Sequence, residues 1–159
     1  MNKLSVAQRA YIAGFLDGDG SIYVQLKKNK TYRYRYQVAP YIVFFQAKKE
    51  RLGLENLQRL TGVGYLRDRN DGIVEYIIGD VTSLLALLTE VTPYLYLKKR
   101  QAVLMLEIIK FKKGARSGAD FLKLCLLIDQ FQQLNYSKRR INITSAVHDV
   151  LHAEGLLTP

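Results

Sequence analysis

Apolar residues run almost unbroken from Ala10 to Leu16, near the start of the chain. Ser5, followed three positions later by Gln8, has the spacing of a capping box, so we expect a helix that begins at Val6. The apolar run leaves no polar face, which is the pattern of a helix that is buried on all sides. The sequence therefore predicts a short, enclosed helix here.

Three small residues, Ala10, Gly14 and Gly18, recur at every fourth position of this helix. At helical periodicity they form one stripe with almost no side chain. Such a stripe lets a second backbone approach closely. A partner helix is therefore expected on that face.

Two carboxylates, Asp17 and Asp19, follow at the predicted end of the helix. The negative end of the helix dipole disfavours anions there, so a compensating group is expected. A hard divalent cation would compensate, and Gly18 and Gly20 would let backbone carbonyls join its coordination shell. The alternative is an ordinary turn, rich in Asp and Gly, that closes the helix. An EF-hand is excluded because position twelve of such a loop is Lys28 instead of Glu.

Alternation of apolar and polar residues replaces the helical pattern from Ser21 to Lys27, which indicates a half-buried strand. A basic turn follows, and residues 32–46 are predicted to form a second strand that completes a hairpin. A second hairpin is expected from strands at 65–69 and 73–78, with a turn at Asn70-Asp71-Gly72 between them. Each hairpin carries basic residues on one face.

Helical segments are expected between and after the hairpins, over residues 50–60, 82–90, 97–112 and 120–135, with a last short helix that ends at about residue 153. This order indicates an α+β fold, in which helices cover one face of an antiparallel sheet and the other face stays free. The 159 residues suit one domain.

Charge indicates the class of partner. The chain carries 24 Lys and Arg against 14 Asp and Glu, a net charge of +10, which predicts an anionic partner. Nucleic acid is favoured over a membrane surface because no basic amphipathic tail or lipidation signal occurs. No apolar run approaches membrane-spanning length and no signal peptide is recognisable. The one cysteine, Cys125, excludes an internal disulfide, and an intracellular protein is expected.

A free sheet face that carries Arg, Lys, Gln and Tyr suits the DNA major groove, which admits β-ribbons. Gln and Arg side chains pair bidentately with adenine and guanine, so the expected base readers are Gln25, Gln37, Arg67 and Arg69. Phosphate contacts are expected from nearby basic residues: Lys27, Lys28, Lys30, Arg33, Arg35 and Lys138. The remaining predicted contacts lie on the same strands and loops: Ser21, Tyr23, Asn29, Thr31, Tyr32, Ala39, Tyr41, Val43, Glu75, Ile77 and Ser137. The alternative, a merely solvated face, is less favoured because two successive hairpins share one charge sign in a basic chain.

The segment IAGFLDGDG, Ile12–Gly20, resembles the LAGLIDADG motif of homing endonucleases, with matches at Ala13, Gly14, Asp17, Asp19 and Gly20. Further similar stretches are GVGYLRDR, PYL-LK and LN-SK, so the resemblance extends over most of the chain. Relatives with one motif are homodimers with an αββαββα core and a saddle-shaped sheet over the DNA. The resemblance implies one homing endonuclease domain over residues 1–159. It implies a dimer that forms through the motif helix, at Ala10, Ala13, Gly14 and Asp17.

The same resemblance implies roles for three side chains. Asp19 matches the aspartate that binds the divalent metal, with the Gly18 carbonyl as a further ligand. Gln46 matches a glutamine that positions water, and Lys98 matches a lysine that polarises water or offsets phosphate charge. Without the resemblance, Gln46 and Lys98 would be interpreted as an ordinary strand-end amide and a solvated lysine.

One position departs from the family pattern. Members usually have a basic residue four positions after the glutamine, but here that position is Glu50. A shift of one residue at the helix start would let Arg51 take this role, so Arg51 completes the predicted catalytic set.

The implied function is a site-specific endonuclease that cuts both strands of a long pseudo-palindromic DNA site and leaves short 3′ overhangs. Mg²⁺ is the expected cofactor, Mn²⁺ a substitute, and Ca²⁺ an ion that supports binding without cleavage. No membrane partner and no small-molecule substrate are expected. The setting would be a chloroplast, a mitochondrion or a prokaryotic cytoplasm. The alternative is a DNA-binding relative that has lost cleavage, or an RNA-binding intron maturase; Glu50 favours it, whereas Asp19, Gln46 and Lys98 favour the nuclease.

Overall fold

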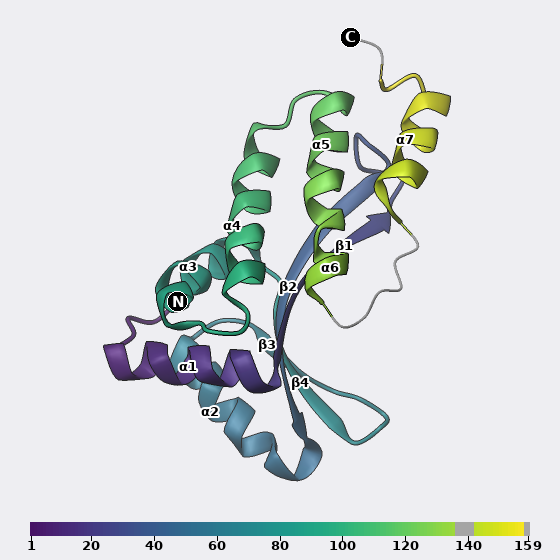
Figure 1. Ribbon diagram of the computed structural model, residues 1–159. Helices are drawn as coiled ribbons and strands as arrows, with labels where there is room; N and C mark the ends of the chain where they lie inside the picture. Colours follow the sequence, from purple (N-terminus) through teal and green to yellow (C-terminus); the bar gives the residue numbers. More distant parts are fainter. Residues whose placement is uncertain (136–141, 158–159) are drawn as a thin grey trace. The chain divides into compact units, whose positions relative to one another are not determined.

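The computed structural model describes residues 1–135 and 142–157. Seven α-helices, four strands and two short 3-10 turns follow one another in the described part of the chain (Figure 1). In chain order they are α1 (Val6–Asp19), β1 (Gly20–Lys28), β2 (Tyr36–Ala47), η1 (Lys48–Glu50), α2 (Arg51–Thr61), β3 (Tyr65–Asp68), β4 (Ile73–Ile78), α3 (Val81–Val91), η2 (Thr92–Tyr94), α4 (Lys99–Gly114), α5 (Gly118–Asp129), α6 (Phe131–Leu134) and α7 (Thr144–Ala153). The order from α1 to α3 is αββαββα, as expected.

The strands form one four-stranded sheet in the order β1-β2-β4-β3. Strand β4 pairs antiparallel with β2, where Ile42 lies opposite Ile78, and antiparallel with β3, where Tyr65 lies opposite Ile77. The predicted α+β class, an antiparallel sheet with helices, is therefore confirmed.

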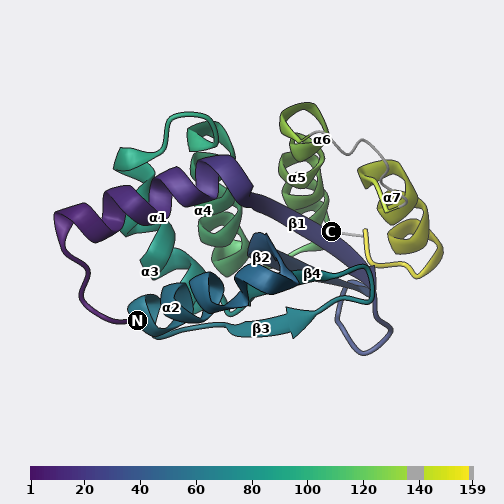
Figure 2. The same ribbon diagram turned by 90° about the horizontal axis from the view of Figure 1, so that it is seen from below.

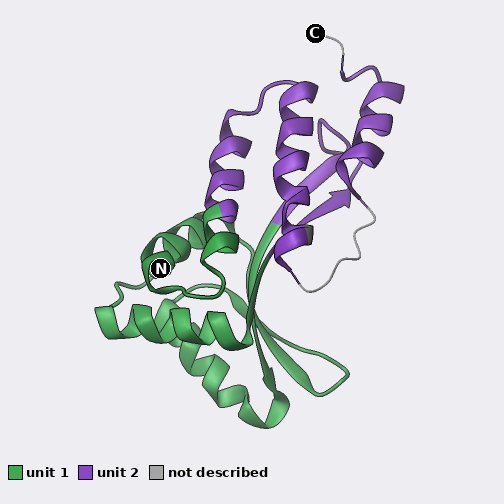
Figure 3. Cartoon of the chain, in the orientation of Figure 1, with its two compact units in different colours: residues 1–22, 40–103 green, residues 23–39, 104–159 purple. Residues whose placement is uncertain are grey.

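The chain divides into two compact units (Figure 3). Unit 1 comprises residues 1–22 and 40–103, and unit 2 comprises residues 23–39 and 104–159. Strands β1 and β2 and helix α4 each contribute residues to both units. The expectation of one domain over the whole chain stays a prediction.

Helix α1 of unit 1 begins as the sequence predicts. The Ser5 hydroxyl accepts a hydrogen bond from the Gln8 amide at 3.3 Å, and the Gln8 side chain accepts one from the Ser5 amide at 2.8 Å. The helix buries Ile12 and Leu16 completely and packs against α3 and the η2 turn (Figures 1 and 2). It is not enclosed on all sides, however, because Tyr11 is 57% exposed.

Aromatic packing forms the centre of unit 1. The ring of Phe44 on β2 stacks on Tyr76 of β4, with centroids 5.6 Å apart, and Phe15 of α1 meets Phe44 edge-on at 5.5 Å. The Tyr76 hydroxyl donates to the Val63 carbonyl at 2.7 Å and shares a hydrogen bond with the Thr61 hydroxyl. Burial raises the pKa of Tyr76 to about 12. The sheet thus holds α1 through apolar side chains. Each such side chain contributes about 1.5–3 kcal/mol to stability when it is fully buried.

Helices α5 and α7 pack together in unit 2. The Asp129 carboxylate at the end of α5 accepts hydrogen bonds from the amide of Thr144, at 2.9 Å, and from its hydroxyl, at 2.6 Å. This contact caps the start of α7 from a neighbouring helix. Cys125 of α5 is fully buried, and burial raises the pKa of its thiol to about 12.

The first hairpin differs from its prediction. Strand β2 begins at Tyr36, four residues later than expected, because the preceding residues form a hydrogen-bonded turn. The Asn29 side chain accepts hydrogen bonds from the Thr31 amide and hydroxyl, and the Arg35 carbonyl accepts one from the Asn29 amide at 2.8 Å. Arg35 itself has a left-handed backbone, with φ of 60°. Tyr32 therefore lies in a turn and not in the ladder.

Among the residues that the structure describes, every helix is too short or too polar to cross a lipid bilayer.

Candidate active site

The end of α1 presents the motif residues at a sharp junction. Helix α1 ends at Asp19 and β1 begins at Gly20 with no loop between them. A Cβ atom at Gly20 would lie 2.5 Å from Leu16 Cδ1 and 2.8 Å from the Leu16 carbonyl oxygen, so only glycine fits. This close approach leaves Asp19 exposed at the tip of the helix, while Asp17 is half-buried one turn back.

Asp19 and Gln46, both members of the predicted catalytic set, come together in the structure. The Gln46 side-chain amide donates to Asp19 Oδ2 at 3.1 Å. Gln46 lies near the end of β2, where its backbone pairs with Val74 of β4. A strand inside the sheet therefore holds the amide against the exposed carboxylate.

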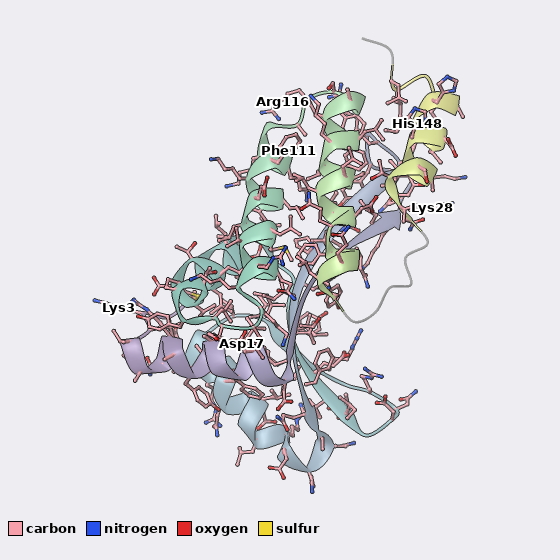
Figure 4. All side chains as sticks on the ribbon, in the orientation of Figure 1. Lys3, Asp17, Lys28, Phe111, Arg116 and His148 are labelled. Atoms are coloured by element: carbon pink, nitrogen blue, oxygen red, sulfur yellow. The ribbon has the colours of Figure 1, made fainter. Side chains whose placement is uncertain are left out.

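Asp17 turns away from this pair toward the loop that leads into α4. Its Oδ2 accepts hydrogen bonds from the amides of Tyr96, at 2.7 Å, and Leu97, at 3.1 Å, and its Oδ1 accepts one from the amide of Lys98 at 2.8 Å. Figure 4 labels Asp17 between α1 and this loop. The resemblance places Asp17 in the dimer interface, but in this structure three amides of its own chain occupy the carboxylate.

The Lys98 side chain returns to the same helix end. Its ammonium donates to the Asp17 backbone carbonyl at 2.5 Å. Partial burial lowers the pKa of Lys98, while the Asp17 and Asp19 carboxylates act in the opposite direction. The predicted lysine therefore lies in the electrostatic field of both motif aspartates.

The contacts of Arg51 are on α2 and β3. Its guanidinium pairs with Glu55 on the same helix, with Nε 2.8 Å from Oε1, and with Asp68 on β3. Glu50, at the position where the family pattern has a basic residue, is exposed. The side chain of Arg51 thus links α2 to β3, and its catalytic role stays a prediction.

The residues at the helix tip fit a divalent cation that is shared with a substrate. The described residues contain no group of three His, Cys, Asp or Glu side chains that could hold a metal ion by themselves. Asp19, however, offers one exposed carboxylate, and the space around Gly18 is open. Mg²⁺ commonly binds to one or two carboxylates together with waters and substrate phosphates. The donor set therefore suits such a cation only when a phosphate is also present.

The part of the sheet in unit 1 carries ion pairs on the predicted DNA-binding face. Arg67 donates to Glu75 Oε2 through Nε, at 2.8 Å, and Arg69 bonds both Glu75 and Asp71. The carboxylate of Glu75 is buried beneath the two arginines. Glu75 thus holds the two predicted base readers in place and is covered by them.

Four predicted contact residues point away from solvent. Val43, Ile77 and Ala39 are at most 5% exposed, and Glu75 is equally buried. Val43 lies opposite Ile77 in the β2–β4 pairing, so each covers the other. The prediction that these side chains contact DNA is therefore corrected to a supporting role under the exposed residues of the face.

In unit 2, the predicted contacts fall on β1, on the turn after it and on the start of β2. Exposed residues of this group are Gln25, Lys27, Lys28, Lys30, Thr31, Tyr32 and Arg33, and half-buried ones are Tyr23, Asn29, Arg35 and Gln37. Arg35 does not extend freely, because its guanidinium donates to Glu154 Oε2 at 2.7 Å and to the Lys30 carbonyl at 2.9 Å. Two other predicted residues, Ser21 and Tyr41, are half-buried in unit 1. Ser137 and Lys138 lie outside the described residues.

The predicted dimer face is exposed at the small residues of α1. Ala10, Gly14 and Gly18 face solvent, and an added Cβ at either glycine would meet nothing within 4 Å. Ala13, by contrast, is completely buried in its own chain, so its predicted place in the interface is wrong. The stripe itself remains open to a second helix.

Two contacts, one in each unit, were not predicted. One is the set of three consecutive amides at residues 96–98, and the other is Glu154, the partner of Arg35. Neither has a periodic or spacing signal, because backbone amides are invisible in sequence and Glu154 lies 119 residues from Arg35. A tertiary structure was needed to find both.

Comparison with known proteins provides independent information. The model of the LAGLIDADG endonuclease family matches residues 12–113. The DNA endonuclease I-CreI of Chlamydomonas reinhardtii is 39% identical over 142 residues, which cover 89% of this chain and 86% of that protein. The DNA endonuclease I-CvuI of Chlorella vulgaris is 34% identical over 146 residues, or 92% of this chain and 91% of that protein.

Solved structures agree with the sequence comparison. A crystal structure of I-CvuI with its DNA target and Ca superposes with a TM-score of 0.90 at 33% identity, and covers 96% of this chain and 97% of that chain. A second I-CvuI structure, with the I-CreI target and Mg, contains uncleaved DNA and gives the same TM-score. An archaeal intron-encoded endonuclease, I-Vdi141I, has a TM-score of 0.83 at 19% identity, with 94% of this chain and 98% of that chain covered, and supports the fold alone.

Proposed function

This chain belongs to the LAGLIDADG endonuclease family, and we propose that it is a homing endonuclease that cuts both strands of a specific DNA site as a homodimer. One observation carries the proposal: an exposed carboxylate, Asp19, accepts a hydrogen bond from Gln46 at the tip of the motif helix. The 39% identity to I-CreI over most of both chains supports the same activity.

The homodimer follows from the number of sites that one chain supplies. Two phosphodiester bonds must be hydrolysed, one on each strand, and a single chain has one motif with one Asp19. A two-fold axis brings two identical helices together and places a site on each strand. The exposed Gly14 and Gly18 on α1 support this arrangement, because they let the helix backbones approach closely.

Each side chain has a defined task in this proposal. Asp19 anchors a divalent cation together with the Gly18 carbonyl, and Gln46 orients the attacking water through its amide. Lys98 places a positive charge beside the reacting phosphate. A bound divalent cation would polarise the scissile phosphate and stabilise the leaving oxygen. Mg²⁺ is the proposed ion, and Mn²⁺ would replace it.

DNA binding is proposed for the exposed positions of the sheet face and the β1–β2 turn. Arg67, Arg69 and Gln25 would read base edges in the major groove, where arginine and glutamine recognise guanine and adenine. Phosphates would be bound by the exposed lysines that follow, Lys27, Lys28 and Lys30. Their exposure and the net charge of +10 support this division of roles.

The decisive experiment incubates the protein with DNA that carries the insertion site of its own coding element. With Mg²⁺ we expect double-strand cleavage with short 3′ overhangs, and with Ca²⁺ we expect binding without cleavage. A matched DNA with a scrambled site is the control and should stay intact under both ions.

A second candidate is a DNA-binding relative that has lost cleavage, or an RNA-binding maturase. The observation in its favour is Glu50, whose exposed carboxylate would repel the phosphate backbone. Tight binding to the site without cutting under Mg²⁺ or Mn²⁺ would replace the nuclease proposal with this one.

A further inference from the structure

The Asp17 carboxylate and the start of α4 form a connection inside unit 1. Three consecutive backbone amides, at residues 96–98, donate to the two oxygens of Asp17 at 2.7–3.1 Å. The Lys98 carbonyl in turn accepts the first hydrogen bond of α4, from the Ala102 amide at 3.0 Å. The C-terminal end of α1 therefore meets the N-terminal end of α4 through one carboxylate.

This connection explains how the negative charge of Asp17 is tolerated near the C-terminal end of α1, where the helix dipole disfavours an anion. An anion is destabilised at the negative end of its own helix, but it is stabilised at the positive end of another. A carboxylate that accepts several backbone hydrogen bonds is held in one geometry. The amides that precede α4 thus hold the Asp17 carboxylate in place. The carboxylate in turn holds the loop at residues 96–98.

The Lys98 side chain makes a further contact with Asp17. Lys98 donates its ammonium to the Asp17 carbonyl at 2.5 Å and its amide to the Asp17 carboxylate at 2.8 Å. Both ends of Lys98 are therefore anchored on a residue two positions before Asp19. Few lysines are held in this way, since a long side chain normally retains much rotamer freedom.

We propose that Asp17 is a positioning residue for DNA cleavage: its carboxylate holds the amides of residues 96–98 and so fixes the loop from which the Lys98 ammonium reaches back to the motif helix. Asp17 acts through Lys98 and does not touch the DNA or the cation itself. The inference rests on the proposed nuclease function, and it adds a role for the first motif aspartate that is distinct from helix packing.

The alternative is that Asp17 only holds two helices together. The two roles differ in their dependence on Lys98. A purely structural carboxylate would affect the rate whether or not Lys98 carries an ammonium, whereas a positioning residue has no effect once its target is removed.

The test is a double-mutant cycle with single-turnover cleavage as the readout. In Asp17→Asn one oxygen becomes an NH₂ group, so the side chain cannot accept from all three amides. We expect the cleavage rate to fall about 100-fold, the effect of a misplacement of about 1 Å. DNA affinity in Ca²⁺ should change less than about threefold, because the proposed DNA contacts lie elsewhere.

The second half of the cycle introduces Asp17→Asn into a chain that already carries Lys98→Met. There we expect Asp17→Asn to lower the residual rate by less than about threefold. A full 100-fold loss in both backgrounds would overturn the proposal and assign Asp17 to the fold alone. Asp17→Glu is a second variant, which retains the charge. The fall in cleavage rate that it causes should also disappear in the Lys98→Met background.

A readout without DNA separates this proposal from the nuclease proposal. Acetylation of surface amines, followed by mass spectrometry, should modify Lys98 slowly in the unaltered protein and faster in Asp17→Asn, while the exposed Lys99 reacts equally in both. If the unaltered protein cuts no DNA, the nuclease proposal fails on that result alone. If Lys98 reacts at the same rate in both proteins, Asp17 does not hold it and the positioning role is wrong.

Discussion

At the scale of single residues, Asp17 and Asp19 show how two carboxylates of one motif acquire different tasks. Asp17 is half-buried and its oxygens accept three amide hydrogen bonds. Asp19 is exposed and accepts one hydrogen bond, from Gln46. A carboxylate has about four acceptor sites, so Asp19 keeps most of its sites for a cation, whereas Asp17 has used most of its own on amides.

This difference predicts the effect of Asp19→Asn. The substitution removes the anion and keeps the size of the side chain, so we expect cleavage in Mg²⁺ to fall about 1,000-fold or more. DNA affinity in Ca²⁺ should fall by less than about tenfold. Asp149→Asn, which removes an exposed carboxylate on α7, is the control and should leave both values unchanged. Equal loss of cutting and binding in Asp19→Asn would mean that this carboxylate is architectural.

At the scale of elements, α1 has two faces with different partners. The face with Ile12 and Leu16 packs into unit 1, and the face with Gly14 and Gly18 is open. An exposed helix face without side chains is costly in a monomer, because glycine lowers helix stability by about 1 kcal/mol relative to alanine. The cost is offset if a second helix uses the space.

We therefore predict that Gly14→Leu prevents dimer formation without unfolding the chain. An added Cβ at Gly14 meets nothing within 4 Å, and Gly14 is exposed, so the side chain extends toward solvent in the monomer. Sedimentation velocity should show a monomer, and cleavage should be lost on both strands. Gly114→Leu is the matched control, since this glycine at the end of α4 also has open space around it. A dimer that persists in Gly14→Leu would place the interface elsewhere.

In the β1–β2 turn, one basic side chain is already paired with a carboxylate. Arg35 was expected to contact phosphate, but its guanidinium binds Glu154 Oε2 at 2.7 Å and the Lys30 carbonyl at 2.9 Å. An exposed ion pair of this kind contributes about 0–1 kcal/mol to stability. Its larger effect is to hold the turn in one conformation.

Salt dependence of DNA binding distinguishes the two basic side chains of this hairpin. Lys28→Gln should reduce the slope of log K against log salt by about 0.9 per subunit, the value for one lost phosphate contact. Arg35→Gln should reduce it much less, because Glu154 already offsets that charge. Equal reductions for the two variants would show that Arg35 leaves Glu154 to bind phosphate.

At the scale of the whole molecule, each compact unit contains a buried acidic group whose pKa is raised to about 12. Burial raises the pKa of Cys125 in unit 2 from 9.0 to about 12 and that of Tyr76 in unit 1 from 10.0 to about 12. In both cases the folded state holds the proton more tightly than the unfolded chain. The stabilisation is complete below the unfolded pKa and is lost as the pH rises toward the folded value.

Stability should therefore decline on the alkaline side, from about pH 9 for Cys125 and about pH 10 for Tyr76, until about pH 12. Each group contributes a slope of about 1.4 kcal/mol per pH unit within its window. Urea unfolding at pH 8, 10 and 11 measures the decline. Cys125→Ala and Tyr76→Phe should each reduce the slope, and a slope that neither variant changes would contradict the assignment.

Local signals were sufficient for much of the fold. The Ser5–Gln8 capping box placed the start of α1, and the Asn70-Asp71-Gly72 turn placed the second hairpin, because caps and tight turns depend on neighbouring residues. The first hairpin was placed less well. The alternation of residues 32–46 continued through a turn, so the local signal of Asn29, which bonds Thr31, was overlooked. Nothing local shows that Glu154 holds Arg35, because the two residues are 119 positions apart.

The sequence by itself determined the helix with its acidic end, the two hairpins, the basic charge and the resemblance to a nuclease family, since each depends on residue type and short spacing. Only the tertiary structure decided which partners the charged groups have. It placed Asp19 against Gln46, Asp17 against three amides, and Arg51 against Glu55 and Asp68. Such partners come from distant parts of the chain, and electrostatic and hydrogen-bond energies depend on distances that no spacing in the sequence contains.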